Sequence, residues 1–194
     1  MMMIWTKVVY SVGGGALSEG KGKDDMFYTE PVYELSTLKA IQHWCEESGR
    51  GFWEYTDECE GSEIWDYLHE VWLMMCNAVE RGLENDGVLP GPLKLSRKAS
   101  NYYIKALSYR NSLQSRGLVY AYALAVSEEN ASGGTIVTAP TCGSCGVMPG
   151  VLYHLAKAHQ FSERKILRAL ATAGLFGNVV KANASISGAE VGCQ

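Results

Sequence analysis

The residues that most restrict how this chain can fold lie between positions 62 and 82, where apolar side chains recur at every third or fourth place. This spacing puts one apolar face on an α-helix and differs from the strict alternation of a half-buried strand. We therefore predict a helix that Ser62 caps and Gly82 ends, and whose apolar face needs partners from the rest of the chain. The residues of that face are Ile64, Leu68, Val71, Trp72, Met75 and Val79.

Similar spacing elsewhere predicts the partner helices, at about residues 36–48, 98–108, 113–129, 149–159 and from 162 onward. Ser36 and Ser162 are the predicted caps, Gly49 is a stop, and Pro149 fits a first helical turn. The last helix is rich in small residues, which are expected to allow close helix contact: Ala169, Ala171, Ala173, Gly174 and Gly177. The predicted fold class is mainly α, a helical bundle.

The N-terminal residues have a different character. Residues 5–12 are rich in β-branched and aromatic side chains and precede three glycines, so we predict one strand there, followed by a polar linker over residues 16–33. A single strand has no sheet to join, which suggests a strand left over from a preceding α/β domain. We therefore divide the chain into residues 1–35, a remnant and linker, and residues 36–194, a partial helical domain.

Charge and composition exclude several classes of protein. The formal charge of −4, with scattered Lys and Arg, argues against a nucleic-acid-binding surface. No apolar run reaches the ~18 residues of a spanning helix, and the first residues do not have the pattern of a signal peptide. We expect a cytoplasmic protein that does not bind membranes, whose six cysteines are thiols or metal ligands rather than disulfides.

Two runs of small and polar residues, 138–150 and 183–194, offer hydroxyls, thiols and backbone N–H groups at close quarters. Such runs cannot fill a core but suit a site for a small polar ligand. The two helices predicted between them would bring both runs to the same end of a bundle. The turn at residues 185–188 could form a nest of N–H groups for a carboxylate.

Cys142 and Cys145 have the spacing of a redox or metal-binding pair. Zinc requires four ligands and no second pair of this kind follows, so two small side chains in a tight glycine loop are the preferred interpretation. His69 and His154 stand beside apolar residues and are expected to be packed or surface histidines rather than bases.

Several motifs, in order and spacing, resemble the bacterial iron–sulfur-dependent L-serine dehydratases (L-serine ammonia-lyases). They are residues 10–15 (YSVGGG), 87–93 (GVLPGPL), 125–130 (AVSEEN) with the glycines at 133 and 134, 138–141 (TAPT) and 183–194 (NASISGAEVGCQ). The resemblance runs from about residue 5 to the last residue.

This resemblance implies deamination of L-serine to pyruvate and ammonia at a four-iron, four-sulfur cluster, without pyridoxal phosphate. It implies that Cys193 is a cluster ligand, that the other ligands lie outside this chain, and that the complete enzyme is a homodimer. Residues 36–194 would be the first part of the catalytic alpha domain, truncated at its C-terminal end, so the chain alone is expected to be inactive. The resemblance assigns no cluster-ligand role to Cys142 or Cys145.

The chemistry also needs an anchor for the serine carboxylate and a base for its α-proton. The residues expected to bind substrate are Thr138, Thr141, Gly143, Ser185, Ser187 and Gly188. No residue is a convincing base, and Glu190 is expected to support the site from outside the ligand shell. Two alternatives stay open: a zinc-binding or redox thiol module using Cys142 and Cys145, and a non-catalytic helical interaction module.

Overall fold

The computed structural model describes residues 7–8, 10–13, 16–18, 32–138 and 142–183. Seven helices dominate this described part, so the predicted mainly α class is confirmed. They are α1 (Leu38–Ser48), α2 (Phe52–Glu60), α3 (Glu63–Glu84), α4 (Ala99–Leu107), α5 (Asn111–Ala131), α6 (Val147–His159) and α7 (Glu163–Asn183). Two short strands, β1 (Tyr10–Gly13) and β2 (Ala16–Ser18), precede them.

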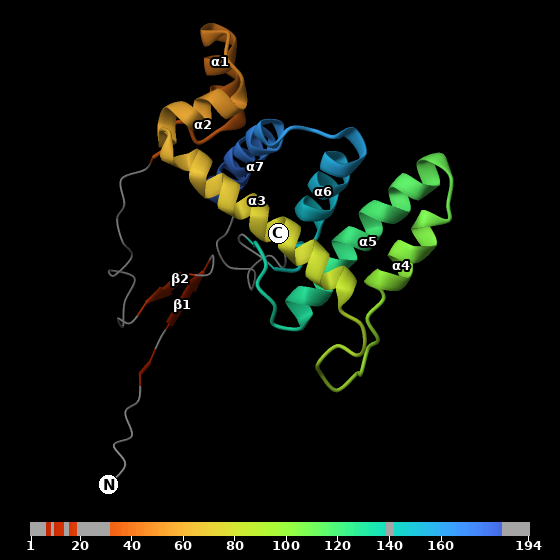
Figure 1. The fold of residues 1–194 in the computed structure, drawn as a ribbon. Coiled ribbons are helices and arrows are strands. Elements are labelled where there is room, and N and C mark those ends of the chain that lie inside the picture. The colour runs from red at the N-terminus through yellow and green to blue at the C-terminus, as the bar shows by residue number, and fades with distance from the viewer. Residues whose placement is uncertain (1–6, 9, 14–15, 19–31, 139–141, 184–194) are drawn as a thin grey trace.

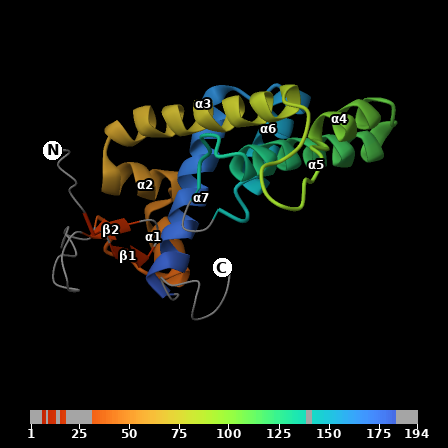
Figure 2. The ribbon, with the colours of Figure 1, turned by 90° about the horizontal axis from the view of Figure 1, so that it is seen from below.

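The longest helix, α3, runs along the helical part of the molecule, with α1 and α2 at one end and the α4–α5 hairpin at the other (Figures 1 and 2). α5 packs against α3, α4 and α6, and α7 packs against α2 and α3. No helix among the described residues is long and apolar enough to cross a bilayer.

The apolar face predicted for residues 62–82 is where the main core forms. Leu68, Trp72, Met75 and Val79 of α3 are buried together with residues of α5, α6 and α7. The ring of Tyr122 in α5 packs edge-on against Tyr153 of α6 at a centroid distance of 4.9 Å. This contact helps to hold α5 against α6. It therefore helps to place the start of α6, where the first small-residue run (138–150) becomes helical.

A second, smaller core joins α1 and α2 to α7. Ile41 of α1, Tyr55 of α2 and Leu175 of α7 are its buried members. Because Ile166 and Leu170 near the start of α7 belong to the main core, this one helix links both. Burial raises the pKa of Tyr55 to about 12, so its hydroxyl stays protonated and accepts a hydrogen bond from the backbone N–H of Leu35 at 3.2 Å.

Several boundary predictions were wrong, each for a local reason. Thr37 rather than Ser36 caps α1, since its hydroxyl oxygen accepts from the N–H of Ala40 at 3.3 Å. Ser62 precedes α3 but makes no side-chain cap. Gly82 does not end α3, which continues for two more residues. Gly49 does end α1, in a left-handed conformation with φ of 67°.

The sequence-based prediction also missed α2 and one strand. The acidic residues around α2 hid its two buried positions, Tyr55 and Thr56, and the carboxylate of Glu54 accepts from the N–H of Gly51 at its first turn, at 2.7 Å. Instead of one strand over 5–12, β1 pairs antiparallel with β2, which lies in the predicted linker. Part of the predicted strand, residues 5, 6 and 9, lies outside the described residues.

Candidate functional site

The last turn of α5 carries a buried carboxylate that collects three hydrogen bonds. The side chain of Glu129 is 5% exposed. Its Oε1 accepts from Nδ2 of Asn85 at 3.0 Å and from Nη1 of Arg97 at 3.1 Å, and its Oε2 accepts from Nε of Arg81 at 3.2 Å. The donors come from the end of α3 and from the loop that follows it, so Glu129 joins three segments of the chain.

The charges around Glu129 keep it ionised. Burial favours the neutral acid, but the hydrogen bonds from Asn85, Arg81 and Arg97 outweigh it and hold the pKa of Glu129 below its usual value. Arg97 is itself only 9% exposed, and such a buried cation is stable only with a partner. Arg97 and Glu129 therefore form a structural ion pair, and Glu129 is a poor proton acceptor near neutral pH.

Both arginines have a second partner in the segment after α5. Nη2 of Arg97 donates to the hydroxyl of Ser132 at 2.6 Å, and that hydroxyl donates to the carbonyl of Glu128 at 2.8 Å. Nη2 of Arg81 donates to the carbonyl of Thr135, also at 2.6 Å. A guanidinium presents several donors in one plane, which suits it to hold a carboxylate and a second acceptor together. The arginines thus tie residues 132–135 to the ends of α3 and α5.

The two neighbours of Glu129 hold other segments. The buried carboxylate of Glu128 accepts from the N–H groups of Lys98, at 2.6 Å, and Ala99, at 3.3 Å, which are otherwise unpaired at the start of α4. Nδ2 of Asn130 donates to the carbonyl of Cys142 at 3.3 Å. We call Glu128, Glu129 and Asn130 the α5 anchor, because three consecutive side chains bind three different parts of the chain.

Two of the family motifs lie close to the α5 anchor. The loop with residues 87–93 returns to the site through a hydrogen bond from the N–H of Arg97 to the carbonyl of Gly87, at 2.8 Å. Residues 125–130 lie in the last turns of α5. The turn at 142–146 contacts them through the hydrogen bond from Asn130 to the carbonyl of Cys142. Motifs far apart in the sequence thus meet at one end of α5.

The start of α6 lies directly on α5. A Cβ atom at Gly146 would stand 2.1 Å from the carbonyl oxygen of Ala123, so only glycine permits this approach. The nearby hydroxyl of Ser127 donates to that same carbonyl at 3.0 Å. The turn with Gly143 and the first turn of α6 therefore have a defined place beside the α5 anchor.

The two cysteines of this turn differ in environment. Cys142 is exposed, whereas Cys145 is buried in the main core. Burial, with a smaller contribution from Cys142, raises the pKa of the Cys145 thiol, which is the opposite of what a reactive thiolate requires. Within the described residues, no group of three or more His, Cys, Asp or Glu side chains could hold a metal ion. The structure therefore does not favour the zinc or redox alternative.

Of the predicted substrate contacts, the structure describes Thr138 and Gly143, both exposed. Thr141, the serines at 185 and 187, Gly188, Glu190 and Cys193 lie outside the described residues. Sequence reasoning assigned no role to the α5 anchor, Arg81, Asn85 or Arg97. The only signal for them was that the motif at 125–130 combines two carboxylates with an amide at the end of an apolar helix.

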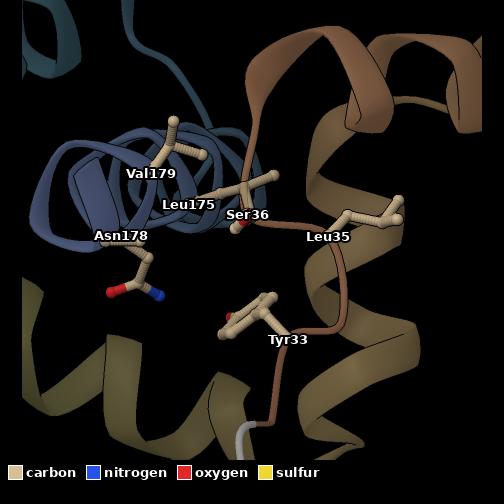
Figure 3. A pocket seen from close by; sticks show the side chains of 7 residues that line it. Tyr33, Leu35, Ser36, Leu175, Asn178 and Val179 are labelled. Atoms are coloured by element: carbon tan, nitrogen blue, oxygen red, sulfur yellow. The ribbon is translucent and has the colours of Figure 1, made fainter.

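A second feature of the fold, a small cleft, lies between residues 33–36 and the last turns of α7 (Figure 3). Its volume of about 70 Å³ is well below the ~300 Å³ of a typical metabolite pocket. Beside it, Nδ2 of Asn183 donates to the carbonyl of Ser36 at 2.8 Å. The cleft is therefore an imperfect contact between the linker and α7 rather than a substrate site.

The histidines do not contribute a base to this region. His154 is buried in α6, and its Nε2 pairs with the hydroxyl of Ser115 at 2.7 Å. His69 pairs through Nδ1 with Glu163 at 2.9 Å and links α3 to the first turn of α7. Both have the packing or surface roles predicted for them.

Comparison with known proteins identifies the family. The model of the serine dehydratase alpha chain matches residues 25–194. The chain belongs to this family. Its curated relatives include L-serine dehydratase of Haemophilus influenzae, 37% identical over 98% of this chain and 45% of the relative. They also include L-serine dehydratase 2 of Escherichia coli, 36% identical over 99% of this chain and 45% of the relative.

L-serine dehydratase of Streptomyces coelicolor is 38% identical over 98% of the chain and 44% of the relative. The similarity to these relatives extends over nearly the whole chain, whereas the family match at 25–194 begins after β1 and β2 and includes all seven described helices. The segment nevertheless spans less than half the length of these curated relatives.

Proposed function

We propose that this alpha-chain segment is part of an L-serine ammonia-lyase that converts L-serine to pyruvate and ammonia. The observation that supports it best is the identity of 36–38% to curated L-serine dehydratases along nearly the whole chain. The gathering of the family motifs at the α5 anchor adds a structural reason. The thiol module and the non-catalytic module lack comparable support.

In this proposal the two small-residue runs bind the serine carboxylate. Thr138 and Gly143 lie close in sequence to Thr135 and Cys142, whose carbonyls accept hydrogen bonds from Arg81 and from Asn130. Gly143 leads into the N-terminal end of α6, where the helix dipole favours a negative charge. Thr141 and the second run would complete the carboxylate-binding site. Ser185, Ser187 and Gly188 would be contacts, and Glu190 would support them.

The general base remains unassigned. Glu129 is excluded by its three donors and lowered pKa, and Glu128 is buried and occupied by the start of α4. For the cofactor, we propose a four-iron, four-sulfur cluster, with Cys193 as one ligand, the others outside this chain, and no pyridoxal phosphate. The support for this cofactor is the family resemblance alone.

We also propose that the complete enzyme is a cytoplasmic homodimer that binds neither nucleic acid nor membranes. The net charge of −4 is consistent with the lack of a nucleic-acid surface. The homodimer rests on the family resemblance. Its product, pyruvate, would connect amino-acid metabolism with gluconeogenesis.

A chimaera tests the proposed function. In the Haemophilus influenzae relative, the region similar to this chain is replaced by residues 1–194, and serine-dependent pyruvate formation is measured under anaerobic conditions. We expect turnover by the chimaera and none by residues 1–194 alone. A soluble, folded chimaera that forms no pyruvate from serine would contradict the proposal.

Cysteine substitutions in the same chimaera test the ligand assignment. We expect Cys193→Ser to abolish activity and lower the iron and sulfide content, because a serine oxygen replaces a thiolate ligand poorly. Cys142→Ser, at an exposed position in the turn, is the matched control and should keep most of the activity. If the control loses the cluster and Cys193→Ser keeps it, the assignment is wrong.

A further inference from the structure

We propose that Arg81 and Asn130 are positioning residues for two of the predicted serine contacts, Thr138 and Gly143, an inference that rests on the function proposed above. Each donates to a backbone carbonyl, at Thr135 and Cys142, close in sequence to a predicted substrate contact. Neither is itself one of the predicted contacts. Together they would hold the backbone next to Thr138 and Gly143 in place before serine binds.

The first attachment goes through Arg81 at the end of α3. Its guanidinium binds Glu129 through Nε, at 3.2 Å, and the carbonyl of Thr135 through Nη2, at 2.6 Å. Because Glu129 is buried on α5, the guanidinium has a fixed orientation. The position of Thr135 is therefore set by the packing of α3 against α5, and Thr138 follows only three residues later.

The second attachment goes through Asn130, the next residue after Glu129. Its side-chain amide donates to the carbonyl of Cys142 at 3.3 Å, and the same carbonyl accepts the N–H of Cys145 at 3.2 Å. That second bond closes the turn before α6, and Gly146 rests on the backbone of Ala123. Cys142 is thus held between α5 and α6, directly before Gly143.

The chemistry of these groups separates positioning from catalysis. Glu129 is 5% exposed and hydrogen-bonded to three donors, so it cannot reach a substrate. Arg81 uses two of its donors within the protein, and the Asn130 amide is neutral and does not transfer protons. We therefore assign their effect on serine to the backbone that they hold.

The first experiment uses residues 1–194 and does not depend on activity. Hydrogen exchange is measured at the backbone N–H groups of Cys145 and Val147, which close the turn before α6. In Asn130→Ala we expect both amides to exchange about fivefold faster, the effect of losing one hydrogen bond. The amides in the middle of α3 should not change. The matched control is Asn77→Ala, an exposed asparagine of α3.

The second experiment uses the active chimaera. Arg81→Lys keeps the charge but cannot bind Glu129 and Thr135 in one plane. For this variant and Asn130→Ala we expect the KM for serine to rise about tenfold, with kcat within about twofold, because a loosened turn weakens carboxylate binding. A purely structural role would instead lower the fraction of active enzyme, so kcat would fall at unchanged KM.

The outcomes separate the two proposals. Unchanged exchange at Cys145 and Val147 in Asn130→Ala, or faster exchange with an unchanged KM for serine, overturns the positioning role. A chimaera without serine turnover refutes the proposed function, and with it any role of these residues toward serine. Faster exchange in that case would still show that Asn130 holds the turn.

Discussion

At the scale of single residues, glycine has opposite roles in two helices of this molecule. A Cβ atom at Gly82 of α3 would stand 2.3 Å from the carbonyl oxygen of Ala125 in α5, so the two helices touch through their backbones. At Gly174 of α7, no atom of a neighbouring element in the described part of the chain lies within 4 Å of the corresponding point. Glycine is therefore required at position 82, whereas at position 174 it only makes the helix less stable.

This difference predicts opposite stability changes. Gly82→Ala should lower the free energy of unfolding by about 1–3 kcal/mol, because α3 has to move away from α5. Gly174→Ala should raise it by about 0.5–1 kcal/mol, because alanine costs less backbone entropy in a helix. Urea denaturation of both variants measures this. Equal shifts of the two midpoints in the same direction would disprove the close contact.

The sequence-based prediction assigned these glycines the other way round. It placed a helix end at Gly82 and close contacts at Gly174 and Gly177, although neither glycine of α7 has a neighbouring element within 4 Å of this point among the residues that the structure describes. The reason is physical: the sequence shows where a side chain is missing but not which backbone approaches the gap. The apolar face of α3 was predictable because periodicity is a local property, whereas helix contact depends on a partner far along the chain.

At the scale of elements, α4 depends on another helix for its first turn. α4 has nine residues, too few to be stable alone in water, and Lys98 at its start provides no side-chain cap. The carboxylate of Glu128 in α5 takes that place by accepting from the N–H groups of Lys98 and Ala99. The sequence could not reveal this cap, because it comes from a residue about 30 positions later.

Removing the cap should loosen α4 first. We expect Glu128→Ala to lower the free energy of unfolding by about 2 kcal/mol, since two N–H groups, one of them buried, lose their carboxylate acceptor. Hydrogen exchange should become faster in residues 99–107 before it does in α3. Glu70→Ala, on the exposed side of α3, is the control and should change little. Uniform acceleration across all helices would argue against a local cap.

At the scale of the whole molecule, two buried ionisable groups make stability depend on pH in the same direction. Burial, with a smaller contribution from His159, lowers the pKa of His154 below its ordinary 6.5. The pKa of Glu129 is held below 4.5 because three hydrogen bonds outweigh the effect of burial. In both cases the unfolded chain binds the proton more readily than the folded one, so acid favours unfolding.

We therefore expect a first loss of stability as the pH falls below about 6.5, from His154, and a second below about 4.5, from Glu129. Above pH 6.5 both contributions are fully present. The test is the free energy of unfolding measured from pH 7.5 to pH 4. His154→Gln should remove the first step, and His43→Gln, at an exposed position on α1, should leave it. A first step that persists in His154→Gln would contradict the assignment.

The candidate site was predictable only in part. Two of the family motifs, residues 87–93 and 125–130, lie near one another at one end of α5, together with the turn at 142–146. The role of the α5 anchor was not predictable, because a glutamate near a helix end is usually solvated. Only the fold shows that Arg81 and Arg97 meet it in a buried place.

The α5 anchor has a consequence for how such a sequence can change through time. Each added residue in a helix turns everything after it by about 100°. One insertion within α5 ahead of Glu128 would therefore swing three neighbouring side chains away from three separate partners at once. A substitution in the same place removes a single attachment. We infer that this part of the gene tolerates substitutions far more readily than insertions or deletions.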